Sequence, residues 1–302
     1  MKIAIFGGTG FIGSTWMKQW IHEGGEVFLV TRRPDQIPIT TRSLVTVCPL
    51  PLQQRLTVDG VINLAGETIN QRWTRAAKTR ILESRIHTTQ HIVEAIVQGQ
   101  LKTEVLINGS AVGYYGHSMD HSFTELDEDQ RMKDDFLGHV TEVWEKEAAK
   151  VIEAGVRLVK ARFGVVLGHT GGALSRMVLP YRMFVGGPIG QGNQWVSWIH
   201  VDDAVQLLNF CLHQKEVQGP VNFTAPQPST MDQLGKTIAK VIKRPHWFPL
   251  PAFMGKALLG EMSDLILKGQ RVIPTMALEH GFSFQYPNLE LALRQILQHE
   301  EK

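Results

Sequence analysis

Short apolar runs rich in β-branched residues alternate with longer amphipathic stretches through the first two-thirds of the chain. A short continuous apolar run fits a strand that is buried on both faces, and apolar positions at helical spacing fit a helix that covers a sheet. The pattern therefore predicts an α/β fold with a doubly wound parallel sheet. We expect strands at Lys2–Phe6, Glu26–Val30, Leu44–Val47, Gly60–Leu64, Val105–Asn108 and Arg157–Arg162. We expect helices at Ser14–Glu23, Arg75–Val97 and Asp134–Ala154.

The pattern changes after Gly164, where glycine-rich loops replace this alternation, and prolines become frequent after Pro245. The apolar stretch Phe248–Leu267 is interrupted by prolines and glycines, so it predicts a small packed lobe rather than a membrane-spanning helix. Its aromatic residues, with Trp195 and Trp198, fit either a substrate pocket or a dimer contact. The sequence does not separate these two alternatives.

These two patterns predict two units. Residues 1–165 are expected to form the doubly wound domain, and residues 196–224 are expected to return to it. Residues 166–195 and 225–302 are expected to form a smaller C-terminal lobe. We expect this lobe on the substrate side, because ligands of open α/β sheets bind beyond the carboxyl ends of the strands.

A glycine-rich segment directly follows the first expected strand and opens the first expected helix. It supplies the candidate cofactor residues Gly7, Thr9, Gly10, Phe11, Ile12 and Gly13. In such a turn one glycine permits the sharp bend, another lets the backbone approach a pyrophosphate, and a third lets helix and strand pack closely. The helix N-terminus then offers N–H donors to the phosphates. A merely flexible turn is the alternative, but the spacing and context favour a Rossmann dinucleotide site.

The second expected strand ends in Thr31-Arg32-Arg33. An NAD-preferring site usually places an acidic residue here, against the ribose 2′-hydroxyl. Two guanidinium groups suit a 2′-phosphate instead, so the predicted cofactor is NADP(H). The alternative is that both arginines are simply solvated in a loop. NAD stays open as well, because Asp35 is near enough in sequence to reach the ribose. Another expected strand ends in Leu64-Ala65-Gly66, where small residues let the backbone pass close beneath the cofactor.

The charge and cysteine content exclude several classes of protein. The net charge of +2 comes from 31 basic and 29 acidic residues without a basic block, so we expect a small-molecule substrate and neither nucleic acid nor a membrane as partner. Cys48 and Cys211 lack CxxC spacing, which indicates neither a disulfide framework nor a zinc site. The first strand leaves no room for a charged leader, so we expect a cytoplasmic protein, with a homodimer as one option.

With these residues in place, most of the chain resembles the extended short-chain dehydrogenase/reductase family, in its sugar-nucleotide epimerase-like branch. The motifs that carry the resemblance are the glycine turn, Leu64-Ala65-Gly66, Ser110 followed by Tyr114-Tyr115-Gly116, Glu125, and His200-Val201-Asp202-Asp203. More narrowly, the segments 170–174, 192–200 and 269–274 resemble a bacterial and organellar subgroup labelled epimerase-family or atypical proteins of this class. The resemblance implies an NAD(P)-binding Rossmann fold with a C-terminal extension.

The chain departs from that family at the catalytic pair, Tyr-x-x-x-Lys on the helix after the fifth strand. Four residues after the four tyrosines stand Ser118, Met119, Val185 and Glu290. Aligning Glu145 with a downstream glutamate of the family puts Leu137 and Thr141 at the two positions, and Arg85 stands where the family has a relay asparagine. Leucine carries no transferable proton, so these departures imply altered chemistry.

The sequence offers other groups for catalysis and substrate contact. Ser110, Tyr114 and Tyr115 are the candidate catalytic residues nearest the expected nicotinamide, although backbone hydrogen bonding and aromatic packing explain them as well. Glu67 and Arg85 follow the fourth strand and fit either a proton carrier with an anion clamp or a salt-bridged surface. The resemblance places Arg162, Trp198 and His200 on the substrate side. Asp202 or Asp203 is expected to cap a helix, so we predict no metal site.

Two functional hypotheses follow. The first is an NADP(H)-dependent oxidoreductase or epimerase-like enzyme that acts on a small polar carbonyl or alcohol with a proton relay other than Tyr-x-x-x-Lys. The second, motivated by the missing pair, is a non-catalytic NADP(H)-binding sensor or assembly factor.

Overall fold

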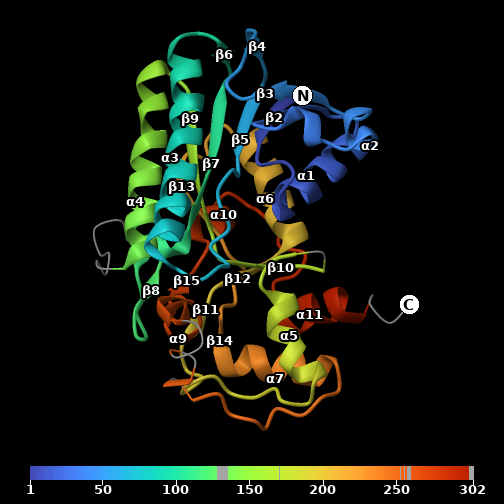
Figure 1. Cartoon of the computed structure of the whole chain (residues 1–302), viewed down its shortest axis with the longest axis vertical. Coiled ribbons are helices and arrows are strands. Elements are labelled where there is room, and N and C mark those ends of the chain that lie inside the picture. The colour runs from blue at the N-terminus through green and yellow to red at the C-terminus, as the bar shows by residue number, and fades with distance from the viewer. Residues whose placement is uncertain (128–134, 170, 252, 255, 257–259, 299–302) are drawn as a thin grey trace.

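Seven parallel strands form one central sheet within the residues that the structure describes, in the spatial order β13-β9-β7-β5-β1-β2-β3. The structure is a computed structural model, and it describes residues 1–127, 135–169, 171–251, 253–254, 256 and 260–298 (Figure 1). The strands are β1 (Lys2–Phe6), β2 (Glu26–Thr31), β3 (Thr46–Pro49), β5 (Gly60–Asn63), β7 (Val105–Ala111), β9 (Arg157–Phe163) and β13 (Gly219–Phe223). The strand order reverses between β1 and β5, which confirms the predicted doubly wound Rossmann class.

Helices cover both faces of this sheet. Alternate residues of β1 point to opposite faces, so Ile3 and Ile5 join one core cluster while Ala4 and Phe6 join another. The first cluster contains buried residues of α1 (Phe11–His22) and α6 (Val201–His213), and the second contains those of α3 (Arg75–Val97) and α4 (Phe136–Ala149). Figure 1 shows α3 and α4 side by side on one side of the sheet and α1 and α6 on the other.

A further core cluster lies beyond the carboxyl ends of the strands (Figure 1). It is built mainly from α5 (Leu174–Arg182), α7 (Met231–Val241) and α11 (Leu289–Gln298), and we call it the C-terminal cluster. Trp198, which is fully buried, belongs to it. The domain boundaries expected from the sequence stay predictions, although β13 does lie beside β9 in the sheet.

Shorter elements connect these layers. The short strands are β4 (Leu56–Thr57), β6 (Leu101–Lys102), β8 (Ser122–Phe123), β10 (Val165–Leu167), β11 (Trp195–Val196), β12 (Trp198–His200), β14 (Ser229–Thr230) and β15 (Arg271–Val272). The short helices are α2 (Ile39–Arg42), α9 (Asp264–Leu267) and α10 (Thr275–Glu279), with 3-10 turns η1 (Pro34–Gln36), η2 (Val112–Tyr115), η3 (Lys150–Ala154) and η4 (Gly260–Ser263).

Several expected element bounds were wrong by a few residues. The expected strand 44–47 is β3, two residues later, and the expected helix 14–23 begins at Phe11 because Gly10 is its N-cap. The expected strand 105–108 continues to Ala111, because β7 keeps its parallel pairing with β9 over that length. The expected helix 134–154 is α4 followed by the 3-10 turn η3, and its expected first residue, Asp134, lies outside the described residues.

Candidate functional site

The turn between β1 and α1 has no room for side chains at two of its glycines. Gly7 has a φ of +80°, and a Cβ on it would lie 2.6 Å from the backbone N of Ala65. A Cβ on Gly13 would lie 2.5 Å from the carbonyl oxygen of Gly7. Gly10, the N-cap of α1, has no side chain that could compete for the first-turn N–H groups. The turn therefore presents bare backbone and a helix N-terminus, as a pyrophosphate requires.

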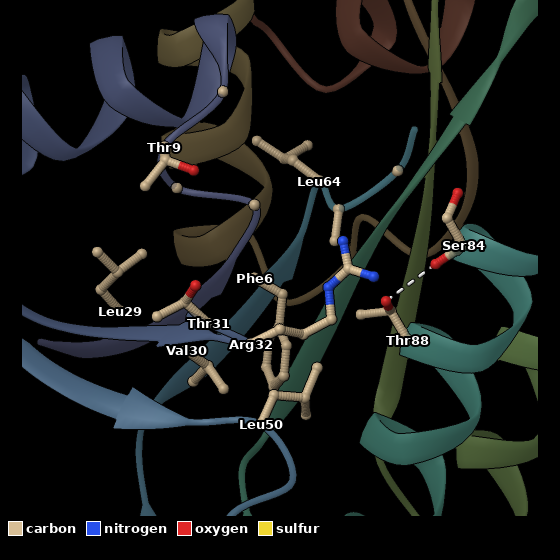
Figure 2. Close-up of a pocket in the computed structure, with 15 residues that line it drawn as sticks. Phe6, Thr9, Leu29, Val30, Thr31, Arg32, Leu50, Leu64, Ser84 and Thr88 are labelled. Carbon is tan, nitrogen blue, oxygen red and sulfur yellow. Dashed lines mark hydrogen bonds between the residues drawn. The ribbon is translucent and has the colours of Figure 1, made fainter. Parts of the chain in front are cut away.

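A cavity of about 220 Å³ opens directly against this turn (Figure 2). Eight of the predicted cofactor residues line it: Gly7, Thr9, Gly10, Thr31, Arg32, Leu64, Ala65 and Gly66. Sequence reasoning missed other lining residues, namely Phe6, Gly8, Leu29, Val30, Leu50, Ser84 and Thr88. Ser84 and Thr88 lie one turn apart on α3, and the hydroxyl of Thr88 donates to the carbonyl of Ser84 over 2.9 Å. Their i,i+4 spacing was the one local signal for a polar face toward the cavity.

The two arginines after β2 are placed differently. Figure 2 shows the guanidinium of Arg32 projecting into the cavity, toward the end of β5 and the face of α3. The Arg33 guanidinium instead reaches Gln36, with 3.5 Å between its Nη1 and the Oε1 of Gln36. The lining residues include no acidic side chain. The electrostatics of this end of the cavity therefore favour an anion, and Arg32 is the cation in position to bind it.

Phe11, another predicted cofactor residue, is not among the residues that line the cavity. Its ring is enclosed by glycines of the segment between β10 and α5. A Cβ on Gly168 would lie 2.6 Å from Cζ of Phe11, and a Cβ on Gly171 would lie 2.7 Å from its Cδ2. Phe11, the first residue of α1, thus connects the turn between β1 and α1 to the glycine segment between β10 and α5. Its neighbour Ile12 packs against the core cluster that contains Ile3 and Ile5.

Arg85 lies under the loop that follows β5. Its guanidinium donates to the carbonyls of Glu67 and Ile81 over 3.0 and 2.9 Å, and a Cβ on Gly66 would lie 2.9 Å from its Cζ. Burial lowers the pKa of Arg85 to about 10. Because the guanidinium is bound to backbone carbonyls, Arg85 positions this loop. The carboxylate of Glu67 lies 3.6 Å from Nε of Arg80, which matches the salt-bridged alternative for this set of residues.

Ser110 and Arg162, at the carboxyl ends of β7 and β9, meet at one buried carboxylate. The Ser110 hydroxyl donates to Oε1 of Glu145 over 2.7 Å. Arg162 donates to both oxygens of Glu145 over 2.8 Å and is completely buried. Burial alone would lower the pKa of Arg162, but its hydrogen bonds and charge pairing with Glu145 raise it. The Glu145 carboxylate is therefore the shared hydrogen-bond partner of both predicted site residues, Ser110 and Arg162.

The two candidate tyrosines have different surroundings. Tyr115 is fully buried, donates to Oδ1 of Asn222 over 2.8 Å and accepts from Arg162 over 3.0 Å. Burial raises the pKa of Tyr115, and the ring stacks on Phe123. Tyr114 is half-buried, and the guanidinium carbon of Arg162 lies 3.6 Å from its ring centroid. Of the two, Tyr114 is the one that solvent and ligands can approach.

Trp198 and His200 lie inside the protein rather than on a substrate surface. The indole of Trp198 donates to the carbonyl of Gln227 over 3.1 Å. His200 stacks on Tyr286 and bonds to Gln295 over 2.9 Å, and burial lowers its pKa. Both side chains are buried, and their predicted contact with substrate stays a prediction.

The predicted N-cap, Asp202 or Asp203, was wrong. His200 itself caps α6, because its Nδ1 accepts from the N–H of Asp202. The buried carboxylate of Asp203 accepts instead from the backbones of Gln285 and Tyr286, over 2.7 and 2.9 Å. Among the described residues, no group of three or more His, Cys, Asp or Glu side chains is arranged to hold a metal ion.

Comparison with known proteins identifies the class to which this fold and cavity belong. Residues 3–223 match the NAD-dependent epimerase/dehydratase family, and residues 250–296 match a domain of unknown function, DUF1731. The chain belongs to the NAD-dependent epimerase/dehydratase family. The resemblance inferred from the motifs, including the C-terminal extension, is thereby confirmed.

Individual relatives match over nearly the whole chain. The chain is 44% identical over 300 residues to the epimerase family protein YfhF of Bacillus subtilis, with 98% of each chain covered. It is 39% identical to the epimerase family protein SH2119 of Staphylococcus haemolyticus, with 98% of this chain and 99% of the relative covered. The crystal structure of human epimerase family protein SDR39U1 with NADPH matches with a TM-score of 0.90 and 32% identity, over 99% of both chains.

Proposed function

We propose that this protein binds NADP(H) in the cavity at the carboxyl ends of β1, β2 and β5, with NAD as a weaker alternative. The observation that carries the proposal is the position of Arg32, whose guanidinium projects into the cavity without an acidic residue among its lining. The bare backbone at Gly7 and Gly13 fits the pyrophosphate, and the match to the NADPH-bound human relative supports the same cofactor.

Calorimetric titration with NADPH and NADH tests this proposal. We expect tighter binding of NADPH. Arg32→Ala should weaken NADPH binding about tenfold to a hundredfold, because a charged hydrogen bond contributes about 1.5 to 3 kcal/mol, and should leave NADH binding nearly unchanged. Arg33→Ala is the matched control and should have a smaller effect, since Arg33 reaches Gln36. Equal weakening of both cofactors by Arg32→Ala would contradict the 2′-phosphate role.

We further propose that the protein is an oxidoreductase or epimerase-like enzyme that acts on a small polar carbonyl or alcohol. A bound nicotinamide supplies or accepts hydride, and the protein must hold the substrate carbon near it and move one proton at the substrate oxygen. Tyr114 supports this role best, because its hydroxyl-bearing ring is half-buried beside the buried Ser110, Glu145 and Arg162 network.

Tyr114→Phe tests the proton-transfer role on a panel of carbonyl and sugar-nucleotide substrates. We expect this variant to lose about 100-fold to 10,000-fold in kcat, the range typical of general acid–base catalysis, while NADPH affinity stays as in the unmodified protein. Tyr115→Phe instead removes two buried hydrogen bonds, to Asn222 and from Arg162, so it should lower stability. Unchanged turnover in Tyr114→Phe would rule out Tyr114 as the proton donor.

A non-catalytic NADP(H)-binding sensor is the second candidate function. It is favoured by the fact that the hydroxyls of Ser110 and Tyr115 are already bound to Glu145 and Asn222. It is also favoured by Leu137 and Thr141, which stand where the family's catalytic pair is expected. NADPH binding without turnover of any substrate in the panel, together with a protein partner that binds only the loaded form, would support the sensor. Measurable hydride transfer would remove it.

A further inference from the structure

Five exposed apolar side chains gather at the end of the molecule opposite the N-terminus. They are Met183, Phe184, Val185, Trp247 and Phe248, and we call them the apolar tip; Trp247 is 69% exposed and Phe248 is 59% exposed. They come from the segments that follow α5 and α7, which run along this end of the molecule (Figure 1). The indole of Trp247 donates to the carbonyl of Phe184 over 2.8 Å, and the N–H of Phe248 donates to Gly186 over 3.1 Å. The two segments therefore form one surface.

The backbone at this tip is held in an unfavourable conformation. Phe184 and Lys243 have φ values of +61° and +53°, and each follows the C-cap of a helix, where glycine is the usual choice. A bulky side chain at such a position costs free energy. Burial of the Phe184 side chain offsets little of this free-energy cost, because the side chain is half-exposed. The packing of the core thus does not account for an aromatic residue at this place.

Cations surround the apolar tip. Arg182, Lys243 and Arg244 are exposed, and the guanidinium carbon of Arg244 lies 4.6 Å from the ring centroid of Phe184. The chain has 29 acidic residues, yet none lies between Glu153 and Asp202 or between Asp232 and Glu261, the two segments that build this end. The near-neutral net charge of the whole chain hides this uneven distribution.

We propose that the apolar tip docks on the surface of an anionic lipid bilayer. Aromatic and aliphatic side chains beside Lys and Arg suit the boundary between acyl chains and negatively charged headgroups. A second copy of this chain on a two-fold axis would bring these cations close to those of its partner without acids between them, which disfavours that occupant. Phe184, Trp247 and Phe248 carry rings that suit base stacking as well, so single-stranded nucleic acid is the alternative occupant that the test addresses.

This contact would be peripheral. No helix among the described residues is long and apolar enough to cross a membrane. The proposal departs from the expectation that the chain has no membrane partner, because that expectation rested on the net charge of +2. It is independent of the proposed NADP(H) function, since the tip contains none of the cavity residues.

Vesicle flotation of the full chain tests the proposal, with vesicles of phosphatidylcholine alone and of phosphatidylcholine with phosphatidylserine. We expect binding only to the vesicles that contain phosphatidylserine, with loss of binding as salt is raised. Lys243→Gln with Arg244→Gln should weaken binding to these vesicles about tenfold or more, because each Lys or Arg near the bilayer surface raises the affinity about fivefold. Phe184→Ser with Trp247→Ser should reduce flotation with these vesicles to background, because the rings that insert into the bilayer are removed.

Two matched controls carry similar changes at other exposed places, Ile39→Ser for the apolar residues and Lys18→Gln for the cations. Both should bind vesicles as the unmodified protein does, and circular dichroism should show that every variant is folded. The proposal is overturned by absence of vesicle binding, or by equal binding to both vesicle types. Stronger binding to single-stranded DNA than to vesicles would also overturn it, as would a dimer that the Phe184→Ser, Trp247→Ser variant disrupts.

Discussion

Single residues at the carboxyl edge of the sheet take part in a buried polar network that spans distant parts of the chain. Glu145 is hydrogen-bonded to Ser110 and Arg162, and Tyr115 links Arg162 to Asn222. Asn222 lies 107 residues after Tyr115 in the sequence. Removing one partner of such a network leaves a buried charge or dipole unpaired, so the network fixes the ends of β7, β9 and β13. The sequence indicated Ser110, Arg162 and Tyr115 separately. Their partners depend on the three-dimensional fold.

His200 provides a prediction about pH at the same scale. Its Nδ1 accepts from the N–H of Asp202 while its Nε2 faces Gln295, an arrangement that suits the neutral imidazole. Burial lowers the pKa of His200 below its usual value of 6.5. The unfolded chain therefore takes up this proton first as pH falls, so the stability contributed by His200 is present above pH 6.5 and is lost toward the lowered pKa.

Urea unfolding of the unmodified protein and of His200→Asn, measured between pH 7 and pH 5, checks this prediction. Asn keeps a cap acceptor for the N–H of Asp202 and does not titrate. The free energy of unfolding of His200→Asn should therefore fall less steeply with decreasing pH than that of the unmodified protein, and the two slopes should differ by up to about 1.4 kcal/mol per pH unit. Identical slopes in the unmodified protein and His200→Asn would contradict the argument.

At the scale of elements, the sequence predicted what local chemistry determines. Six strands of the sheet, the long helix α3 and the glycine turn follow from apolar runs, helical spacing and glycine placement, and they were found within a few residues. The strand β13 was not predicted, since residues 196–224 were expected only to return to this domain. The helices α5, α7 and α11 were not predicted, because Pro180 lies inside α5 and glycines and prolines elsewhere in that region hid the helical spacing. Likewise, the part of the cavity wall formed by Leu50, Ser84 and Thr88 comes from elements that only the fold brings together.

At the scale of the whole molecule, the cofactor turn and the loop after β5 both contact the segment that leads into the C-terminal cluster. Phe11, the first residue of α1, lies among the glycines that precede α5. Arg176 of α5 donates to Asn70, in the loop after β5, over 2.5 Å. The chain that follows the cavity residues Gly10 and Gly66 is therefore, in both places, in contact with the segment that leads into the C-terminal cluster. A change in the glycine segment should consequently be transmitted to the cofactor.

Gly168→Ala tests this connection, because the added Cβ would lie 2.6 Å from the ring of Phe11 and 2.9 Å from Val201. We expect a loss of stability of about 1 to 3 kcal/mol from overpacking, and NADPH affinity about tenfold lower because Phe11 must shift with the phosphate turn. Urea unfolding and calorimetric titration measure the two effects. In a Phe11→Ala background the ring is gone, so adding Gly168→Ala should cost much less in both measurements. If Gly168→Ala weakens NADPH binding by the same factor with and without Phe11, the ring is not the element that couples the glycine segment to the cofactor turn.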